Sequence, residues 1–94
     1  MSNSCTYQAV GRLDTTTAAD AEKAMLALLV NDVNTIEVNM SALDYVSSAG
    51  LRVLLLLAKA AKAKGGKLIL TALKPQILEV IKISGFDRIL TIQA

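Results

Sequence analysis

Four segments with the apolar pattern of strands alternate along this chain with three that have the pattern of helices. This alternation limits the fold more than any other feature, because a helix between two successive strands favours parallel pairing through right-handed crossovers. The predicted order is β-α-β-α-β-α-β. A chain of 94 residues has the length of one domain. The sequence therefore predicts a single α/β domain, 1–94, with a small and mostly parallel sheet.

The predicted boundaries follow from breaks in these patterns. Gly65 and Gly66 end the second helix, as glycine does at a left-handed C-cap. Pro75 stands in the first turn of the third helix, where its missing N–H costs nothing. Residues 41–46 are interpreted as a short extended passage into the second helix. The predicted strands are 6–13, 35–40, 67–71 and 89–92; the predicted helices are 18–30, 48–64 and 75–84, the last with Ile77, Val80, Ile81 and Ser84 on its inner face.

The second helix carries more apolar surface than one packed face requires. Residues 53–58 are all apolar, and six residues make more than one and a half turns, so they cover every direction around the helix axis. Two interpretations stay open: the neighbouring helices bury both sides of this helix, or an exposed apolar patch marks a protein partner site. The side chains that must face outward or meet a neighbouring helix are among Val53, Leu56, Leu57 and Ala60.

The composition argues against an enzyme. The chain has no histidine and one cysteine, Cys5, which excludes Ser-His-Asp and Cys-His catalytic sites and zinc sites of ordinary composition. The eight carboxylates form no tight cluster in the sequence for Mg²⁺, and no glycine-rich phosphate loop is present. We therefore predict a binding module without a metal or cofactor.

Charge and hydropathy also restrict the partners and the location. A net charge of +2 and only three aromatic residues are poor support for nucleic-acid binding, which uses basic patches and stacking side chains. The longest apolar run, 24–30, has seven residues, whereas a membrane span needs about 20. The first ten residues lack the pattern of a signal peptide, and a single thiol fits a reducing compartment. We expect a cytoplasmic protein that does not insert into a membrane.

Two adjacent serines stand where extended chain turns into the second helix. The simple interpretation is that one of them caps the helix, with its hydroxyl accepting a backbone N–H. The other interpretation is a phosphorylation switch, because a helix N-terminus tolerates a phosphoryl group while the added charge disrupts a partner interface. The residue pattern alone does not choose between a cap and a switch at Ser47 and Ser48.

Several short motifs, taken together, resemble the STAS domain family. They cover nearly the whole chain in order, and the Ser-Ser-Ala-Gly-Leu-Arg run at the start of the second helix is the most specific. The motifs are Gly-Arg-Leu-Asp at 11–14, Thr-Ala at 17–18, Leu-Asp-Tyr-Val-Ser-Ser-Ala-Gly-Leu at 43–51, Gly-Gly-Lys-Leu at 65–68 and Ile-Ser-Gly-Phe at 83–86.

The resemblance implies a function and a set of site residues. Single-domain members of the family are anti-sigma factor antagonists: the unphosphorylated form binds an anti-sigma factor that is also a serine kinase, phosphorylation with ATP breaks the complex, and a serine phosphatase restores it. Counted back from Gly50 and Leu51, the phosphorylated residue is Ser48. The family often has Asp where this chain has Ser47, which leaves Ser47 as a rival acceptor. The resemblance implies partner contacts by Asp14, Asp44 on an approach loop, Ser47, Ala49, Gly50, Arg52, Val53 and Leu56.

Further expectations accompany the resemblance. The family commonly begins with a two-stranded hairpin, but only ten residues precede Gly11, so one strand is expected to be missing or very short. That would leave a sheet edge open to another chain, although we expect a monomer or a weak dimer. The alternative function is a structural STAS subunit of a membrane-associated complex, for example in lipid transport, without phosphorylation. A small-molecule sensor would need an apolar pocket with convergent polar groups.

Overall fold

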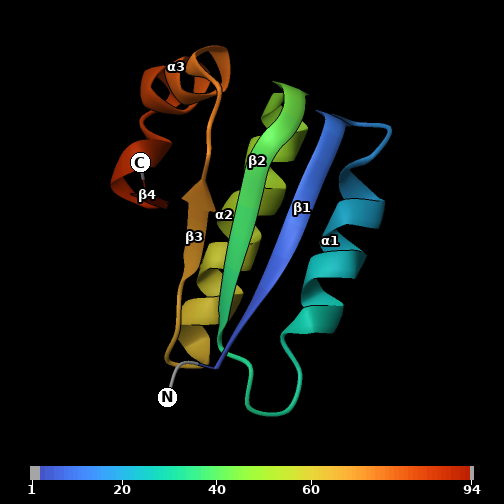
Figure 1. Ribbon diagram of the computed structural model, residues 1–94, viewed down its shortest axis with the longest axis vertical. Coiled ribbons are helices and arrows are strands. Elements are labelled where there is room, and N and C mark those ends of the chain that lie inside the picture. Colours follow the sequence, from blue (N-terminus) through green and yellow to red (C-terminus); the bar gives the residue numbers. More distant parts are fainter. Residues whose placement is uncertain (1–2, 94) are drawn as a thin grey trace.

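The computed structural model describes residues 3–93 and contains the predicted alternation of strands and helices. All strand pairs are parallel, and the sheet order is β1-β2-β3-β4 (Figure 1). The predicted fold class is confirmed. In the described residues a single strand leads into the Gly-Arg-Leu-Asp motif and includes its first three residues, and this strand forms an edge of the sheet. The elements are β1 (Ser4–Leu13), α1 (Ala18–Leu28), β2 (Thr35–Val46), α2 (Ser48–Ala63), β3 (Leu68–Thr71), α3 (Pro75–Ser84), a 3₁₀ turn (Phe86–Arg88) and β4 (Thr91–Gln93).

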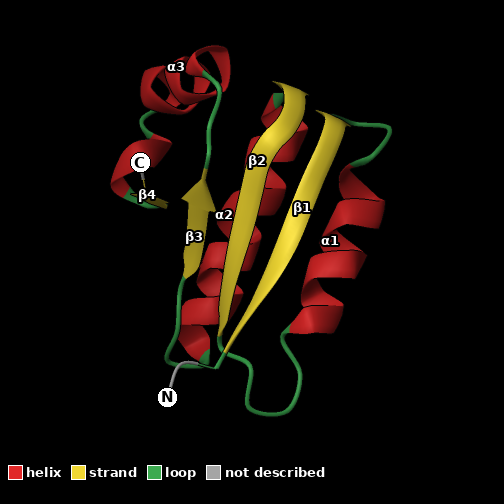
Figure 2. Cartoon of the chain, in the orientation of Figure 1, coloured by secondary structure: helices red, strands yellow, loops and turns green. Residues whose placement is uncertain are grey.

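The core lies between the sheet and the helices. In Figure 2, α2 lies behind the sheet, α1 stands beside β1, and α3 sits at the end where the strands finish. Alternate side chains of β2 point into this core, as predicted for 35–40, and α2 presents Leu54 and Leu57 to them. Full burial of one such side chain contributes about 1.5–3 kcal/mol. In β2 the residues between these buried positions, such as Glu37 and Asn39, are half-buried, whereas Thr6 and Gln8 on the edge strand β1 are exposed.

Strand β2 is six residues longer than the predicted strand 35–40, and the predicted passage 41–46 is its second half. The pairing with β1 contains two register shifts, in which β2 advances one residue more than β1. Each extra residue interrupts the two-residue alternation, so the buried positions after Met40 are Leu43 and Val46 at intervals of three. The prediction ended the strand where this alternation stopped.

The apolar side chains of helix α2 divide into buried and exposed ones. Val53 and Leu57 are buried against the sheet and the neighbouring elements, whereas Leu56 is 39% exposed. Helix α1 packs against α2 and β1, but it does not cover the side of α2 that carries Leu56. The exposed apolar area of α2 is therefore smaller than the set of outward-facing candidates predicted from the sequence.

The C-terminal part differs from the prediction in two places. On α3, Ile77 and Ile81 are buried as expected, but Val80 and Ser84 are exposed, so the buried face is one narrow stripe. After Gly85, whose φ of 81° is left-handed, the chain makes the 3₁₀ turn, and Ile89 has a helical backbone rather than an extended one. The predicted strand 89–92 consequently begins at Thr91.

Candidate functional site

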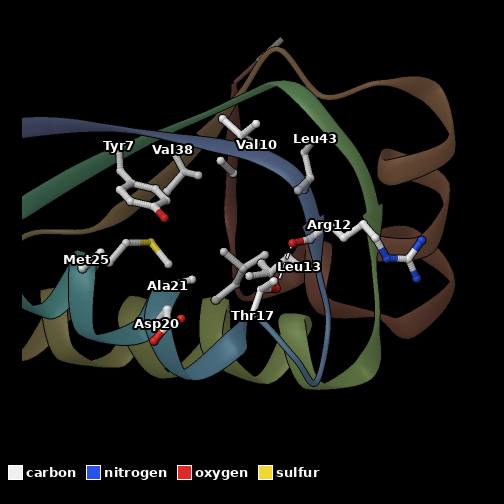
Figure 3. Close-up of a pocket in the computed structure, with 13 residues that line it drawn as sticks. Tyr7, Val10, Arg12, Leu13, Thr17, Asp20, Ala21, Met25, Val38 and Leu43 are labelled. Carbon is white, nitrogen blue, oxygen red and sulfur yellow. Dashed lines mark hydrogen bonds between the residues drawn. The ribbon is translucent and has the colours of Figure 1, made fainter.

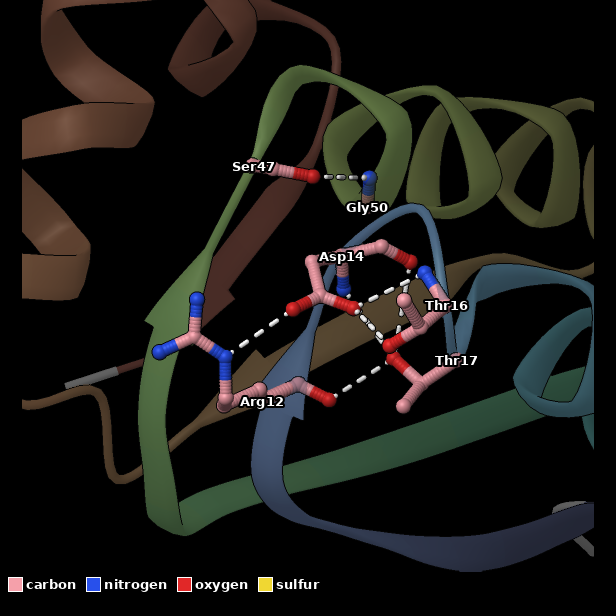
Figure 4. A network of polar contacts seen from close by, with 6 residues as sticks. All are labelled: Arg12, Asp14, Thr16, Thr17, Ser47 and Gly50. Carbon is pink, nitrogen blue, oxygen red and sulfur yellow. Dashed lines mark hydrogen bonds and ion pairs between the residues drawn. The ribbon is translucent and has the colours of Figure 1, made fainter.

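The serine pair lies at the carboxyl ends of β1 and β2, where α2 begins. The backbone N–H of Ser47 donates to the carbonyl oxygen of Leu13 at 2.9 Å, which ties the start of α2 to the end of β1. Gly50 makes this close approach possible: a Cβ built there would lie 2.4 Å from the same Leu13 oxygen. The loop that carries Asp14 is therefore held next to the first turn of α2 (Figure 4).

The two serines have different environments. Ser47 is the N-cap of α2: its backbone is extended, and its half-buried side chain accepts a hydrogen bond from the Gly50 N–H at 3.4 Å. Ser48 is the first helical residue and is exposed, and its hydroxyl makes no hydrogen bond with any residue of 3–93. The cap interpretation thus applies to Ser47, and Ser48 has a free hydroxyl.

Asp14 is the centre of a polar network in the loop after β1 (Figure 4). One carboxylate oxygen accepts from the backbone N–H and the hydroxyl of Thr16, at 3.0 and 2.7 Å. The other accepts from Nε of Arg12 at 2.9 Å. Thr17 completes the loop, since its hydroxyl donates to the Arg12 carbonyl and accepts from the Asp14 N–H. Thr16 first, then Arg12, lower the pKa of Asp14 from 3.8 to about 2.

Arg12 also connects this network to β2. Its guanidinium carbon lies 4.4 Å from the centre of the Tyr45 ring, its partner in the strand register, which is the geometry of a cation–π contact. Neither Arg12 nor Tyr45 was predicted from the sequence as a site residue. The signal was available, because Arg12 and Asp14 are two residues apart and side chains at that spacing share one face of a strand.

Asp14→Asn should weaken the pH dependence of stability in acid. A carboxyl group whose pKa is lower in the folded state stabilises the fold above its unfolded pKa, and this contribution disappears as the pH falls through the folded pKa. We expect the melting temperatures of wild type and Asp14→Asn to differ above pH 4 and to converge towards pH 2, as measured by circular dichroism. Asp32→Asn, at an exposed turn position, is the control; the same convergence there would contradict the assignment to Asp14.

The remaining predicted partner residues divide into exposed and buried groups. Asp44 lies on β2 rather than on a loop, is exposed and pairs with Lys74. Arg52 is exposed and Ala49 half-buried. Gly50 is buried, and Val53 is 5% exposed, so these two offer no surface to a partner and instead hold α2 in place.

A shallow groove of about 270 Å³ runs beside Ser48. One wall is formed by α2, and the other by Ser84 and Phe86 at the end of α3. This second wall was not predicted, because nothing in the pattern of residues 75–88 places it next to the start of α2. The groove residues are Ser48, Leu51, Arg52, Leu55, Ser84 and Phe86.

A separate cavity of about 320 Å³ lies between α1 and β1 (Figure 3). Its volume is at the lower end of the range for small-molecule sites, and side chains such as Met25 and Leu13 line it. The hydroxyl of Thr17, which also lines it, is already engaged with the Arg12 carbonyl. The polar side chains of Tyr7, Arg12 and Asp20 also line the cavity. Among residues 3–93 no group of three metal-ligating side chains is found, and no helix there could span a membrane.

Comparison with known proteins decides the family. The family model described as "STAS domain" matches residues 2–94. The chain belongs to the STAS domain family. The chain is also 40% identical over 76 residues to BtrV of Bordetella bronchiseptica, which is assigned as an anti-sigma factor antagonist. This match covers 81% of the chain but 66% of BtrV, so the STAS chain spans slightly less than two thirds of its relative.

Solved structures of the same fold include antagonists of this kind. A Thermotoga maritima protein assigned as an anti-sigma factor antagonist superposes with a TM-score of 0.87 at 20% identity, covering 98% of this chain and 80% of its own. Unphosphorylated SpoIIAA, an anti-sigma factor antagonist, gives 0.81 at 22% identity and coverages of 100% and 83%. SpoIIAA in its phosphorylated form gives 0.73 at 19% identity and coverages of 100% and 86%. At these identities the likeness shows the shared fold.

Proposed function

We propose that this STAS domain is an anti-sigma factor antagonist switched by phosphorylation of Ser48. In its unphosphorylated form it binds an anti-sigma factor that is also a serine kinase. The phosphorylated form is released, and a serine phosphatase resets it, all within the cytoplasm. The name of BtrV and the structures of SpoIIAA support the antagonist role, and the local geometry supports the choice of serine.

The observation that carries the proposal is the contrast between the two serines. A kinase needs an accessible hydroxyl, and Ser48 is exposed with no hydrogen-bond partner in residues 3–93. Ser47 is half-buried and its oxygen is already engaged as the cap of α2. This favours Ser48 over its rival.

The chemistry requires nothing from the domain except the hydroxyl. In the proposed step, Ser48 Oγ attacks the γ-phosphorus of ATP, the new O–P bond forms, and the bond from that phosphorus to the bridging oxygen breaks. ADP leaves with the bond electrons, and the serine proton passes to a base of the kinase. The domain is a substrate and binding partner in this reaction, and the catalytic groups belong to the kinase.

The added phosphoryl group would change the binding surface without disrupting the fold. It carries a charge of about −1.5 to −2 at neutral pH, and the start of a helix favours a negative group. The same charge stands beside the apolar groove, where a partner would have to remove it from water. Repulsion and desolvation then oppose the complex.

The proposal is tested by incubating the purified protein with ATP and its kinase, isolated by pull-down from its own cells, and measuring intact and peptide masses. We expect one phosphoryl group on Ser48, none on Ser48→Ala, and loss of the complex once the group is attached. Modification of Ser47 instead would leave the phosphorylation mechanism in place but would show that Ser47, and not Ser48, is the phosphorylated residue. A stable complex that is never modified would favour the alternative, a constitutive structural subunit.

A further inference from the structure

Arg52 is the one charged residue of the groove beside Ser48. The other residues that line it are apolar or hydroxyl-bearing: Leu51, Leu55, Phe86 and Ser84. Arg52 is exposed and makes no hydrogen bond or ion pair with any residue of 3–93. The arginine of the neighbouring loop, Arg12, is already bound to Asp14. Arg52 is therefore available to an anion that appears in the groove.

The helix brings Arg52 to the same side as Ser48. The two residues are four apart on α2, and side chains at this spacing are neighbours with Cβ atoms roughly 5–6 Å apart. Side chains on a helix also lean towards its N-terminus. The long Arg52 side chain is thus directed back over the turn that carries the Ser48 hydroxyl, and both residues line one groove.

We propose that the Arg52 guanidinium forms an ion pair, within the domain, with a phosphoryl group on Ser48. The inference rests on the proposed phosphorylation of Ser48 and adds how the modified state is organised. A guanidinium can donate two parallel hydrogen bonds to phosphate oxygens. A negative group four residues before a positive one is also the favourable order along a helix.

This pairing would change the charge of the partner-binding surface in two ways. It would add the negative charge of the phosphoryl group, and it would remove from the surface the free positive charge of Arg52. Two neighbouring cations are already paired within the fold, Arg12 with Asp14 and Lys74 with Asp44. Of these three cations, Arg52 is therefore the one that remains free to bind the phosphoryl group.

The test is a ³¹P NMR pH titration of the full chain with phosphoserine incorporated at position 48 during synthesis. A nearby guanidinium favours the dianion, so we expect the second pKa of the phosphoryl group to rise by roughly half a unit in Arg52→Gln. Arg52→Lys should fall between wild type and Arg52→Gln. Lys59→Gln is the matched control, because this exposed lysine of α2 lies three turns away from Ser48.

Equal phosphate pKa values in wild type and Arg52→Gln would overturn the inference, and so would an equal rise in Lys59→Gln, which would show a general charge effect. Because the phosphoserine is installed without a kinase, this result is independent of whether the cell modifies Ser48. The mass measurement proposed above decides that separate question. All three substitutions are at exposed positions, so folded protein is expected in each case.

Discussion

Gly50→Ala should lower the free energy of unfolding by about 2 kcal/mol, the range expected for an overpacked buried site. Alanine normally stabilises a helix interior relative to glycine by roughly 0.5–1 kcal/mol, so the expected sign is opposite to helix propensity. The reason is space: the new Cβ would lie 2.4 Å from the Leu13 carbonyl oxygen and 2.9 Å from Cγ2 of Val46. One of these groups must move.

The Leu13 oxygen cannot move without further loss, because it also accepts the hydrogen bond from the Ser47 N–H. The displacement would therefore pass to the first turn of α2 and change the position of Ser48 relative to Asp14. Gly50, predicted as a partner contact, acts instead by positioning the site. Its lack of a side chain sets how close the helix lies to β1.

Thermal unfolding followed by circular dichroism measures this effect. For a domain of this size about 1 kcal/mol corresponds to 4–8 °C, so Gly50→Ala should melt roughly 8–16 °C below wild type. Ser48→Ala is the matched control, since it changes an exposed residue in the same turn and should alter stability by less than about 0.5 kcal/mol. An unchanged or higher melting temperature for Gly50→Ala would contradict the close contact.

The fold followed from the sequence because strands and helices have different apolar periods, and glycines and Pro75 mark the breaks between them. The prediction was wrong where a local feature hides the period. Two extra residues in β2 shift its buried positions from intervals of two to intervals of three, so Leu43 and Val46 did not look like strand residues. Such bulges depend on pairing with β1, which a single segment does not reveal.

The site was predictable in part, for a similar reason. The resemblance gave Ser48 and Asp14, and the residue types gave a cap or a switch. The sequence did not show that Ser47 is the cap, that Gly50 touches Leu13, or that Phe86 forms the far wall of the groove. These are distances between elements far apart in the chain, and they become visible only when the helices are packed.

The two serines should respond differently to the same substitution. Ser48→Asp places a negative charge at the first position of α2, where the helix dipole favours it by roughly 0.3–1 kcal/mol, so the fold should be as stable as wild type or slightly more stable. Binding to the anti-sigma factor should weaken about 100-fold, because repulsion between like charges, or burial of an unpaired charge, costs several kcal/mol at an interface. Ser48→Ala should bind as wild type does.

Ser47→Asp should retain both stability and binding. Aspartate is as good an N-cap as serine, so its carboxylate can accept the Gly50 N–H that Ser47 accepts now, and the half-buried position keeps the charge away from a partner. Ser47→Ala removes the cap and should cost about 1 kcal/mol of stability.

Calorimetric titration with the purified partner and thermal unfolding of all four variants give the two readouts separately. Equal loss of binding in Ser47→Asp and Ser48→Asp would show that charge anywhere at the start of α2 blocks the partner, and the distinction between cap and switch would then be wrong.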